Sequence, residues 1–222
     1  MKVTLVQDIL DANRRVSAAN KRRFDEHGLL VLNLMSSPGA GKTTLLEHCI
    51  SALAGELAIG VIEGDIQTSL DADRIEAAGA AFAHQINTRG ACHIDGNMIA
   101  PVVDEMDLDA LDLLFVENVG NLVCPAEFDV GEDEKLVLFS VTEGDDKPKK
   151  YPLMFQVSGV MLVNKIDLLP HLDADLDKIH AHARDVHPDM RIFDISCKTG
   201  EGLDAFYGWL REAVARKKAT RV

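Results

Sequence analysis

The chain has 222 residues, of which 47% are hydrophobic and 27% are charged, and its formal net charge is −13 at pH 7. This length suits one α/β domain, or one domain with a small appendage, and the apolar fraction is that of a globular rather than a disordered chain. The acidic surplus argues against nucleic acid as a partner, because a nucleic-acid surface needs clustered Lys and Arg. No apolar stretch is long enough to cross a bilayer and no signal peptide is recognisable, so we expect a cytoplasmic protein without membrane contacts.

The predicted elements alternate between helices and strands. Residues 3–26 have apolar positions at helical spacing and are followed by Gly28, which predicts an amphipathic N-terminal helix. Short apolar runs predict strands over residues 29–35, 57–62, 81–86, 113–117, 136–141, 159–163 and 190–195. Helical spacing predicts helices over residues 43–53, 69–79, 98–105, 172–186 and 203–215, with a loop over 144–148. The alternation predicts an α/β fold with a mostly parallel sheet and helices on both faces.

A glycine-rich turn joins the first predicted strand to the helix that follows. It reads Ser36-Ser37-Pro38-Gly39-Ala40-Gly41-Lys42-Thr43-Thr44. Glycines allow backbone N–H groups to wrap a phosphate chain, and the N-terminus of the following helix adds positive partial charge. We expect Lys42 to contact the β- and γ-phosphates and the Thr43 hydroxyl to bind Mg²⁺. The turn therefore predicts a P-loop NTPase, although Ser36 stands where the usual pattern has Gly.

Two carboxylates follow predicted strands. Asp65 comes just after the second strand, and Glu117 ends the strand over 113–117. Ligands of parallel α/β sheets collect at the carboxyl ends of the strands, and Mg²⁺ prefers oxygen ligands. We therefore predict that Thr43, Asp65 and Glu117 bind Mg²⁺, and that both acids are catalytic together with Lys42. The alternative is that each acid is simply a polar residue at the start of a loop.

A second motif predicts the base that is bound. Asn164-Lys165-Ile166-Asp167 directly follows the strand over 159–163. A carboxylate at Asp167 accepts hydrogen bonds from N1–H and the exocyclic amine of guanine, whereas adenine has no such pair of donors. We expect Asn164 to brace the loop, Lys165 to lie along the base, and the segment Ser196-Cys197-Lys198 to contact guanine from its other side. The predicted nucleotide is GTP or GDP.

These segments together resemble the HypB family of nickel-incorporation GTPases, which belongs to the SIMIBI class of P-loop GTPases. The resemblance runs through nearly the whole chain and includes Glu63-Gly64-Asp65-Ile66-Gln67-Thr68, Gly90-Ala91-Cys92-His93 and Glu117-Asn118-Val119-Gly120-Asn121-Leu122-Val123-Cys124-Pro125. It implies GTP hydrolysis and delivery of Ni²⁺ to the immature large subunit of a [NiFe] hydrogenase. It also implies a homodimer that depends on nucleotide or metal, and a HypA-like metallochaperone as partner. On this basis we divide the chain into an N-terminal helical segment, residues 1–28, and a GTPase domain, residues 29–222.

Three residues form a candidate metal site beside the nucleotide motifs. Cys92 and His93 are adjacent, and Cys124 lies on the segment that follows Glu117. Thiolate and imidazole are good ligands for Ni²⁺ and Zn²⁺, and a two-fold dimer would bring two such sets together. Since Cys124 lies close to Glu117 in the sequence, movement driven by the γ-phosphate is expected to alter metal affinity. The alternative is two small buried cysteines and a surface imidazole.

The catalytic machinery is otherwise incomplete in the sequence. No obvious catalytic Gln or arginine finger is present, and Arg74, Arg89 and Lys147 are candidates only. A urease-type nickel GTPase remains the alternative, but that family has a Cys-Pro-His pattern where Cys92 and His93 are adjacent here. A small-molecule kinase would leave the guanine motif without a purpose. A metal-storage protein with a purely structural nucleotide would fail to hydrolyse GTP.

Overall fold

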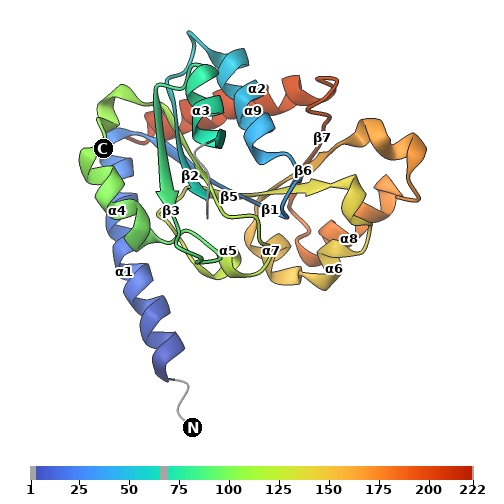
Figure 1. Cartoon of the computed structure of the whole chain (residues 1–222), viewed down its shortest axis with the longest axis horizontal. Helices are drawn as coiled ribbons and strands as arrows, with labels where there is room; N and C mark the ends of the chain where they lie inside the picture. The colour runs from blue at the N-terminus through green and yellow to red at the C-terminus, as the bar shows by residue number, and fades with distance from the viewer. Residues whose placement is uncertain (1–3, 66–69, 222) are drawn as a thin grey trace.

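The structure is a computed structural model that describes residues 4–65 and 70–221 (Figure 1). Its centre is a seven-stranded sheet in which all neighbouring strands are parallel, in the order β3-β2-β4-β1-β5-β6-β7. The strands are β1 (Leu30–Ser36), β2 (Ile59–Asp65), β3 (Phe82–Asn87), β4 (Leu113–Glu117), β5 (Glu134–Ser140), β6 (Val160–Asn164) and β7 (Arg191–Asp194). The prediction of an α/β fold with a parallel sheet is confirmed.

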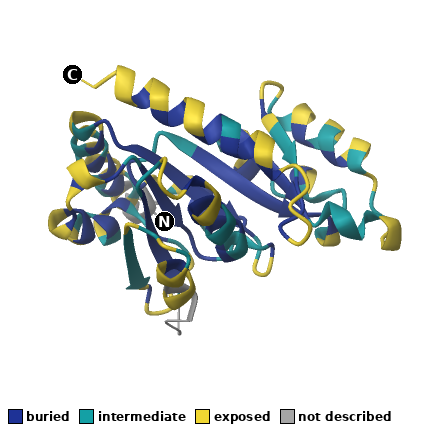
Figure 2. Ribbon diagram, turned by 90° about the horizontal axis from the view of Figure 1, so that it is seen from above, coloured by how far each residue is buried: buried dark blue, intermediate teal, exposed yellow. Residues whose placement is uncertain are grey.

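Helices cover both faces of this sheet (Figures 1 and 2). One face carries α2 (Lys42–Leu53), α3 (Leu70–Ala77) and α9 (Leu203–Ala219). The other carries α1 (Thr4–His27), α4 (Gly96–Glu105), α7 (Pro152–Val157) and α8 (Leu176–Val186). Shorter elements are η1 (Leu108–Ala110), α5 (Cys124–Glu127), η2 (Val141–Glu143), α6 (Lys147–Lys150) and η3 (Ile166–His171). Within residues 4–65 and 70–221, no helix has both the length and the apolar character that a bilayer crossing requires.

The apolar strands explain this three-layer arrangement. Leu30, Leu32 and Leu34 belong to the apolar cluster under α2 and α9, whereas Val31 belongs to the cluster under α1 and α4. A strand of a parallel sheet is buried on both faces, so it reads as a continuous apolar run. Asn33 and Ser36 are the polar residues within β1, and both are 0% exposed.

Several boundaries differ from the sequence predictions. The second strand runs to Asp65 rather than residue 62, because β2 continues to pair with β3 up to Asp65 and Asn87. The helix expected from 172 begins only at Leu176, where the Asp175 side chain caps the Lys178 N–H. Position 69 of the helix expected over 69–79 and position 3 of the N-terminal helix lie outside the described residues, as do residues 66–68.

Three short α-helices of the described residues were not predicted, and neither were the 3-10 helices η1, η2 and η3. Each of α5, α6 and α7 has a proline in its first turn, namely Pro125, Pro148 and Pro152. Proline fixes φ near the helical value and lacks the N–H that a first turn leaves unpaired, so it favours that position. The loop expected over 144–148 therefore gives way to α6 at Lys147.

A polar stripe of the N-terminal helix α1 bonds the start of α4 and the segment before β5. Asn13, Ser17 and Asn20 are buried, and the Asn13 and Asn20 amides bond backbone groups of Gly96 and residues 129–130. Gly131 lies so close to this stripe that a Cβ there would come within 2.8 Å of the Ser17 carbonyl oxygen. The N-terminal part of α1 extends beyond the rest of the molecule (Figure 1). Division of the chain at residue 28 stays a prediction.

Gly131→Ala is expected to lower the free energy of unfolding by about 2–4 kcal/mol, from overpacking against α1 and a left-handed backbone conformation. Gly131 has φ +102 and backbone atoms of α1 within 3 Å of the added Cβ. Gly55→Ala is the matched control, because Gly55 has φ +81 but nothing within 4 Å of its Cβ position. Urea unfolding measures both variants, and equal losses would contradict tight packing of α1 against Gly131.

Candidate functional site

The glycine-rich turn lies between β1 and α2, as the sequence predicts. Lys42 begins α2, and its Nζ donates to the Ser36 Oγ at 3.0 Å. Gly41 has φ +106, and a Cβ there would lie 2.6 Å from the Asn164 Nδ2. Only glycine suits such a left-handed residue in close contact with a neighbouring loop. The turn therefore has the strand-to-helix setting and the open backbone of a phosphate-binding loop.

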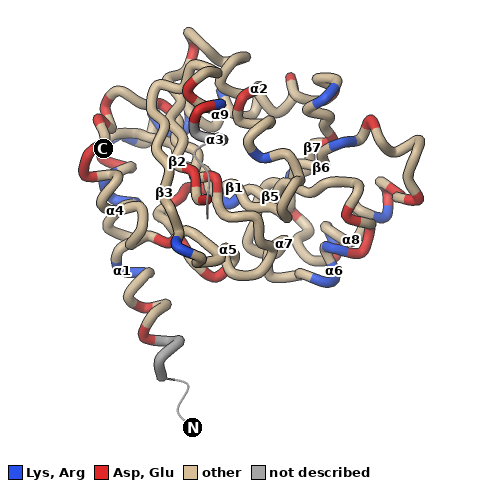
Figure 3. Tube along the Cα trace, in the orientation of Figure 1, with Lys and Arg blue, Asp and Glu red and all other residues tan. Residues whose placement is uncertain are grey.

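Acidic residues lie at the carboxyl ends of β2 and β4, beside this turn (Figure 3). Glu117 is 4% exposed and its Oε1 accepts a hydrogen bond from the Thr43 Oγ1 at 3.1 Å. Glu63 is equally buried and pairs with Glu117 across the two strands, while Asp65 ends β2. Hydroxyl and carboxylate oxygens form a donor set that fits Mg²⁺. Glu63 was not predicted, because only the strand register places it opposite Glu117.

The guanine motif lines a pocket of about 340 Å³. Its walls are Gly41, Thr44, Asn164, Lys165, Asp167, Leu168, Cys197 and Lys198. Asn164 is buried and braces three loops, since its Nδ2 donates to the Ala40 carbonyl at 2.8 Å and its Oδ1 accepts from the Cys197 N–H at 3.1 Å. The Lys165 Nζ donates to the Gly39 carbonyl at 2.7 Å. The P-loop and both base loops thus surround one cavity.

Two residues at this pocket have further contacts. The Asp167 Oδ1 accepts a hydrogen bond from the Ser196 Oγ at 2.6 Å, which orients the carboxylate. Burial raises the pKa of the Cys197 thiol to about 11, so this small residue stays neutral beside the base loop. Ser196 is fully buried, whereas Lys198 is exposed. The segment 196–198 therefore lies where the sequence predicts a contact with the base.

Cys92, His93 and Cys124 lie together in space. One ligand atom from each is within 4.8 Å of the others, and no other such cluster occurs among the described residues. Cys92 is exposed, and Cys124 and His93 are half-buried. The His93 ring stacks on Phe128, with ring centroids 3.9 Å apart. Two thiols and one imidazole are a donor set for Ni²⁺ or Zn²⁺ with an open position.

The electrostatics of this cluster suit a metal. Burial lowers the pKa of the His93 imidazole, while the nearby carboxylates of Asp95 and Glu127 oppose that shift. The ring is therefore favoured in the neutral form that binds metal. The hydrogen bond with Cys124 is the largest cause that raises the pKa of the Cys92 thiol. A cation that replaced this shared proton would favour both thiolates.

The segment that follows Glu117 connects the two sites. The Asn121 Nδ2 donates to the Cys92 carbonyl at 3.2 Å, and Asn118 bonds the backbone of Ile94. On the opposite side, a Cβ at Gly120 would lie 3.0 Å from backbone atoms of Pro38 in the P-loop. Neither asparagine was predicted as a site residue, although both stand in the run that carries the family resemblance.

The three candidate cations lie in separate places. Arg74 pairs with Glu47 at 2.6 Å and also donates to the Thr44 Oγ1 at 3.3 Å. Arg89 has a positive φ of 50 in the loop after β3. The Lys147 ammonium lies over the Tyr151 ring, 5.2 Å from its centroid. Of the three, Arg74 is the one that contacts the P-loop segment.

Comparison with known proteins agrees with this arrangement. The family described as "CobW/HypB/UreG, nucleotide-binding domain" matches residues 30–194. The hydrogenase maturation factor HypB of Rhizobium leguminosarum is 49% identical over 97% of this chain and 72% of its own length. The chain belongs to the HypB family. The predicted resemblance is thereby confirmed.

Two solved HypB structures share the fold. HypB from Helicobacter pylori, crystallised in complex with nickel, has a TM-score of 0.86 and 38% identity, over 93% of this chain and 97% of that chain. HypB from Archaeoglobus fulgidus has a TM-score of 0.86 and 36% identity, over 92% of this chain and 99% of that chain. Both matches therefore include nearly all of the parallel sheet and the helices that cover it.

Cys124→Ala is expected to weaken nickel binding by at least about tenfold, because removing one of three ligands costs more than removing a supporting contact, which typically costs about 10–100-fold. Cys49→Ala is the matched control, since Cys49 is fully buried and burial raises the pKa of its thiol. Competition against a chromophoric chelator gives both affinities. Wild-type affinity in Cys124→Ala would contradict the three-residue site.

Proposed function

We propose that this HypB-family protein hydrolyses GTP and helps to insert nickel into an immature [NiFe] hydrogenase, with its metal site coupled to nucleotide-dependent dimerisation. The observation that carries the proposal is the short segment from Glu117 to Cys124, which lies against both the P-loop and the metal cluster. The names of the relatives and the nickel complex of one solved HypB structure support the hydrogenase assignment.

The nucleotide chemistry is phosphoryl transfer from GTP to water. Lys42 and the P-loop amides stabilise negative charge on the transferred group, and Asp65 and Glu117 join Thr43 in holding Mg²⁺. When bound, Mg²⁺ neutralises charge on the β- and γ-phosphates. Positioning accounts for most of such catalysis, and the loop that Asn164 braces and the Asp167 carboxylate that Ser196 orients would position the nucleotide for it.

Nickel is cargo in this proposal. Cys92, His93 and Cys124 hold Ni²⁺, and the same donor set accepts Zn²⁺. An exposed Cys92 and an open fourth position allow transfer to or from a partner, which we assign to a HypA-like metallochaperone and the hydrogenase large subunit. In a two-fold homodimer, the clusters of both protomers meet at the interface. The setting is the cytoplasm, where thiols stay reduced.

Asp167→Asn is expected to lower GTP hydrolysis efficiency by at least about 100-fold and to raise that for XTP, because an amide matches the N1–H and C2 carbonyl of xanthine. Release of phosphate from each nucleotide is the measurement. Asp173→Asn is the control, since Asp173 is an exposed acid on the loop before α8. A wild type that hydrolyses neither nucleotide would contradict the GTPase proposal.

Dimer formation is tested by light scattering after size-exclusion chromatography, with GDP or a non-hydrolysable GTP analogue, and with or without Ni²⁺. We expect the mass to double with the analogue, with nickel, or with both, because γ-phosphate and metal each order the segment between Glu117 and Cys124. The mass of one chain, 24.2 kDa, in all four conditions would contradict the dimer.

A further inference from the structure

Buried polar residues cross the face of the sheet that carries α1 and α7. Asn33 on β1 and Asn118 after β4 are 0% exposed, and Lys135 on β5 is 7% exposed. The Glu132 side chain beside them is 6% exposed. Burying such groups costs free energy unless each has partners, so a parallel sheet normally excludes them. The proposed phosphoryl transfer and metal binding use none of these four side chains.

The four side chains form a hydrogen-bonded network. At one end, this network bonds the segment that contains Cys92 and His93. The Asn118 Oδ1 accepts from the Ile94 N–H at 2.9 Å, and its Nδ2 donates to the Ile94 carbonyl at 3.5 Å. Both backbone groups of the residue after His93 are therefore fixed by one amide. Asn118 directly follows Glu117, the last residue of β4, so a displacement of that strand end would also displace Asn118.

In the middle the network passes through the strand that leads into the P-loop. The Asn118 Nδ2 also donates to the Asn33 Oδ1 at 3.1 Å, and the Asn33 Nδ2 donates to the Glu132 Oε1 at 3.3 Å. Asn33 pairs with Val116 on β4 and with Lys135 on β5. Asn33 is thus connected to each end of the network in two ways, by the pairing of β1 with β4 and β5 and by side-chain hydrogen bonds to Asn118 and Glu132.

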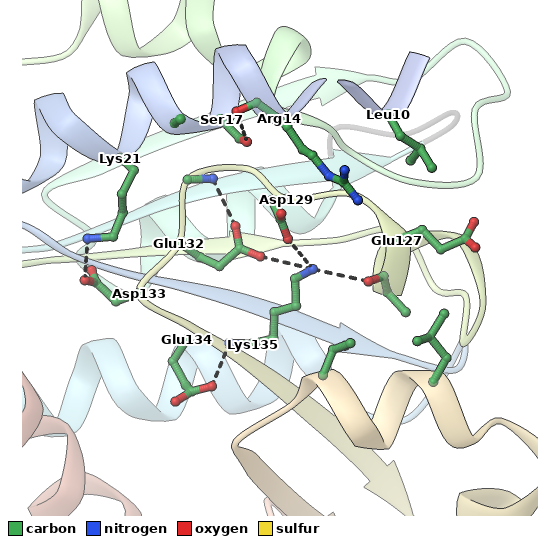
Figure 4. Close-up of a pocket in the computed structure, with 15 residues that line it drawn as sticks. Leu10, Arg14, Ser17, Lys21, Glu127, Asp129, Glu132, Asp133, Glu134 and Lys135 are labelled. Carbon is green, nitrogen blue, oxygen red and sulfur yellow. Dashed lines mark hydrogen bonds and ion pairs between the residues drawn. The ribbon is translucent and has the colours of Figure 1, made fainter. Parts of the chain in front are cut away.

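At the other end the network binds the segment that contains Cys124 (Figure 4). The Lys135 Nζ donates to the Ala126 carbonyl at 3.3 Å and to the Asp129 Oδ1 at 2.7 Å, and it faces the Glu132 Oε1 at 3.5 Å. Ala126 shares the single turn of α5 with Cys124. The second Glu132 oxygen accepts from the N–H groups of residues 130 and 131.

We propose that Asn118, Asn33, Glu132 and Lys135 are positioning residues. They connect the segment of Cys92 and His93 and the segment of Cys124 to β1 and β4, the strands that lead to the nucleotide site, and thereby make nickel affinity depend on the bound nucleotide. The proposal rests on the proposed function and names the residues that carry its coupling. A fully satisfied polar network in a low-dielectric interior is rigid, so a shift of Asn118 alters both ligand segments together. If the network only stabilised the fold, its disruption would lower the free energy of unfolding but leave the effect of nucleotide on nickel affinity unchanged.

The test compares nickel affinity of the full chain in the GDP state and with a non-hydrolysable GTP analogue. Glu132→Gln retains an oxygen for the N–H groups of residues 130 and 131, but its amide nitrogen faces the Asn33 donor and breaks that link. Lys135 keeps Asp129 as a charged partner in this variant. Asn33→Leu breaks the network at its centre. Glu134→Gln is the matched control, because Glu134 lines the pocket drawn in Figure 4 together with Glu132 and Lys135, while its carboxylate accepts from the N–H groups of Gly159 and Lys135.

We expect the wild-type affinities to differ between the two nucleotide states by at least about fivefold, the lower end of typical couplings. Glu132→Gln and Asn33→Leu should bring this ratio to within about twofold of unity, whereas Glu134→Gln keeps the wild-type ratio. If Glu132→Gln and Asn33→Leu keep the wild-type ratio, the positioning role of the network is overturned, while the proposed coupling between nucleotide and nickel stands. A wild type with no difference between the states would overturn the proposed coupling as well.

Hydrogen exchange of the wild type tests the same inference without a substitution. The amide of Ile94 and those of residues 130 and 131 all donate to side chains of the network. Exchange in segments 91–97 and 128–133 should change together when the GTP analogue replaces GDP. A nucleotide effect in only one of the two segments, or in neither, would overturn the proposal.

Discussion

The parallel pairing of β1 with β4 is the constraint on which the rest of the site depends. Its register places Leu34 beside Glu117, so the strand that enters the P-loop ends next to the carboxylate that bonds Thr43. Parallel strands end at one edge, and there the P-loop, the acids and the base loops converge. The segment that follows Glu117 therefore begins beside the P-loop, where Gly120 lies against Pro38, before the chain reaches Cys124.

Through this segment, the three candidate metal ligands are connected to the P-loop by direct contacts. Gly120 faces Pro38 on one side, and Asn121 bonds the Cys92 backbone on the other. Linkage is reciprocal for binding free energies: if nucleotide changes the affinity for nickel, nickel changes the affinity for nucleotide by the same factor. Under the proposed function, this arrangement would let GTP hydrolysis change how tightly nickel is held.

Local sequence was sufficient wherever a motif combines a strand, a turn and a helix. The P-loop and the segment 164–167 were predicted with their neighbours, since turn chemistry and apolar runs are local signals. Cys92 and Cys124, far apart in sequence, were joined by family resemblance, because spacing alone does not reveal a shared site. The pairing of Glu63 with Glu117 and the link from Asn33 to Glu132 arise from strand register and tertiary packing, which no local pattern contains.

The central claim is that one protein links a guanine-nucleotide site to a nickel site. Fluorescent GDP and a fluorescent non-hydrolysable GTP analogue should be titrated into the full chain with and without saturating Ni²⁺. The account predicts that nickel changes the ratio of the two nucleotide affinities, by the factor that reciprocity requires. A ratio that is the same with and without nickel would contradict it.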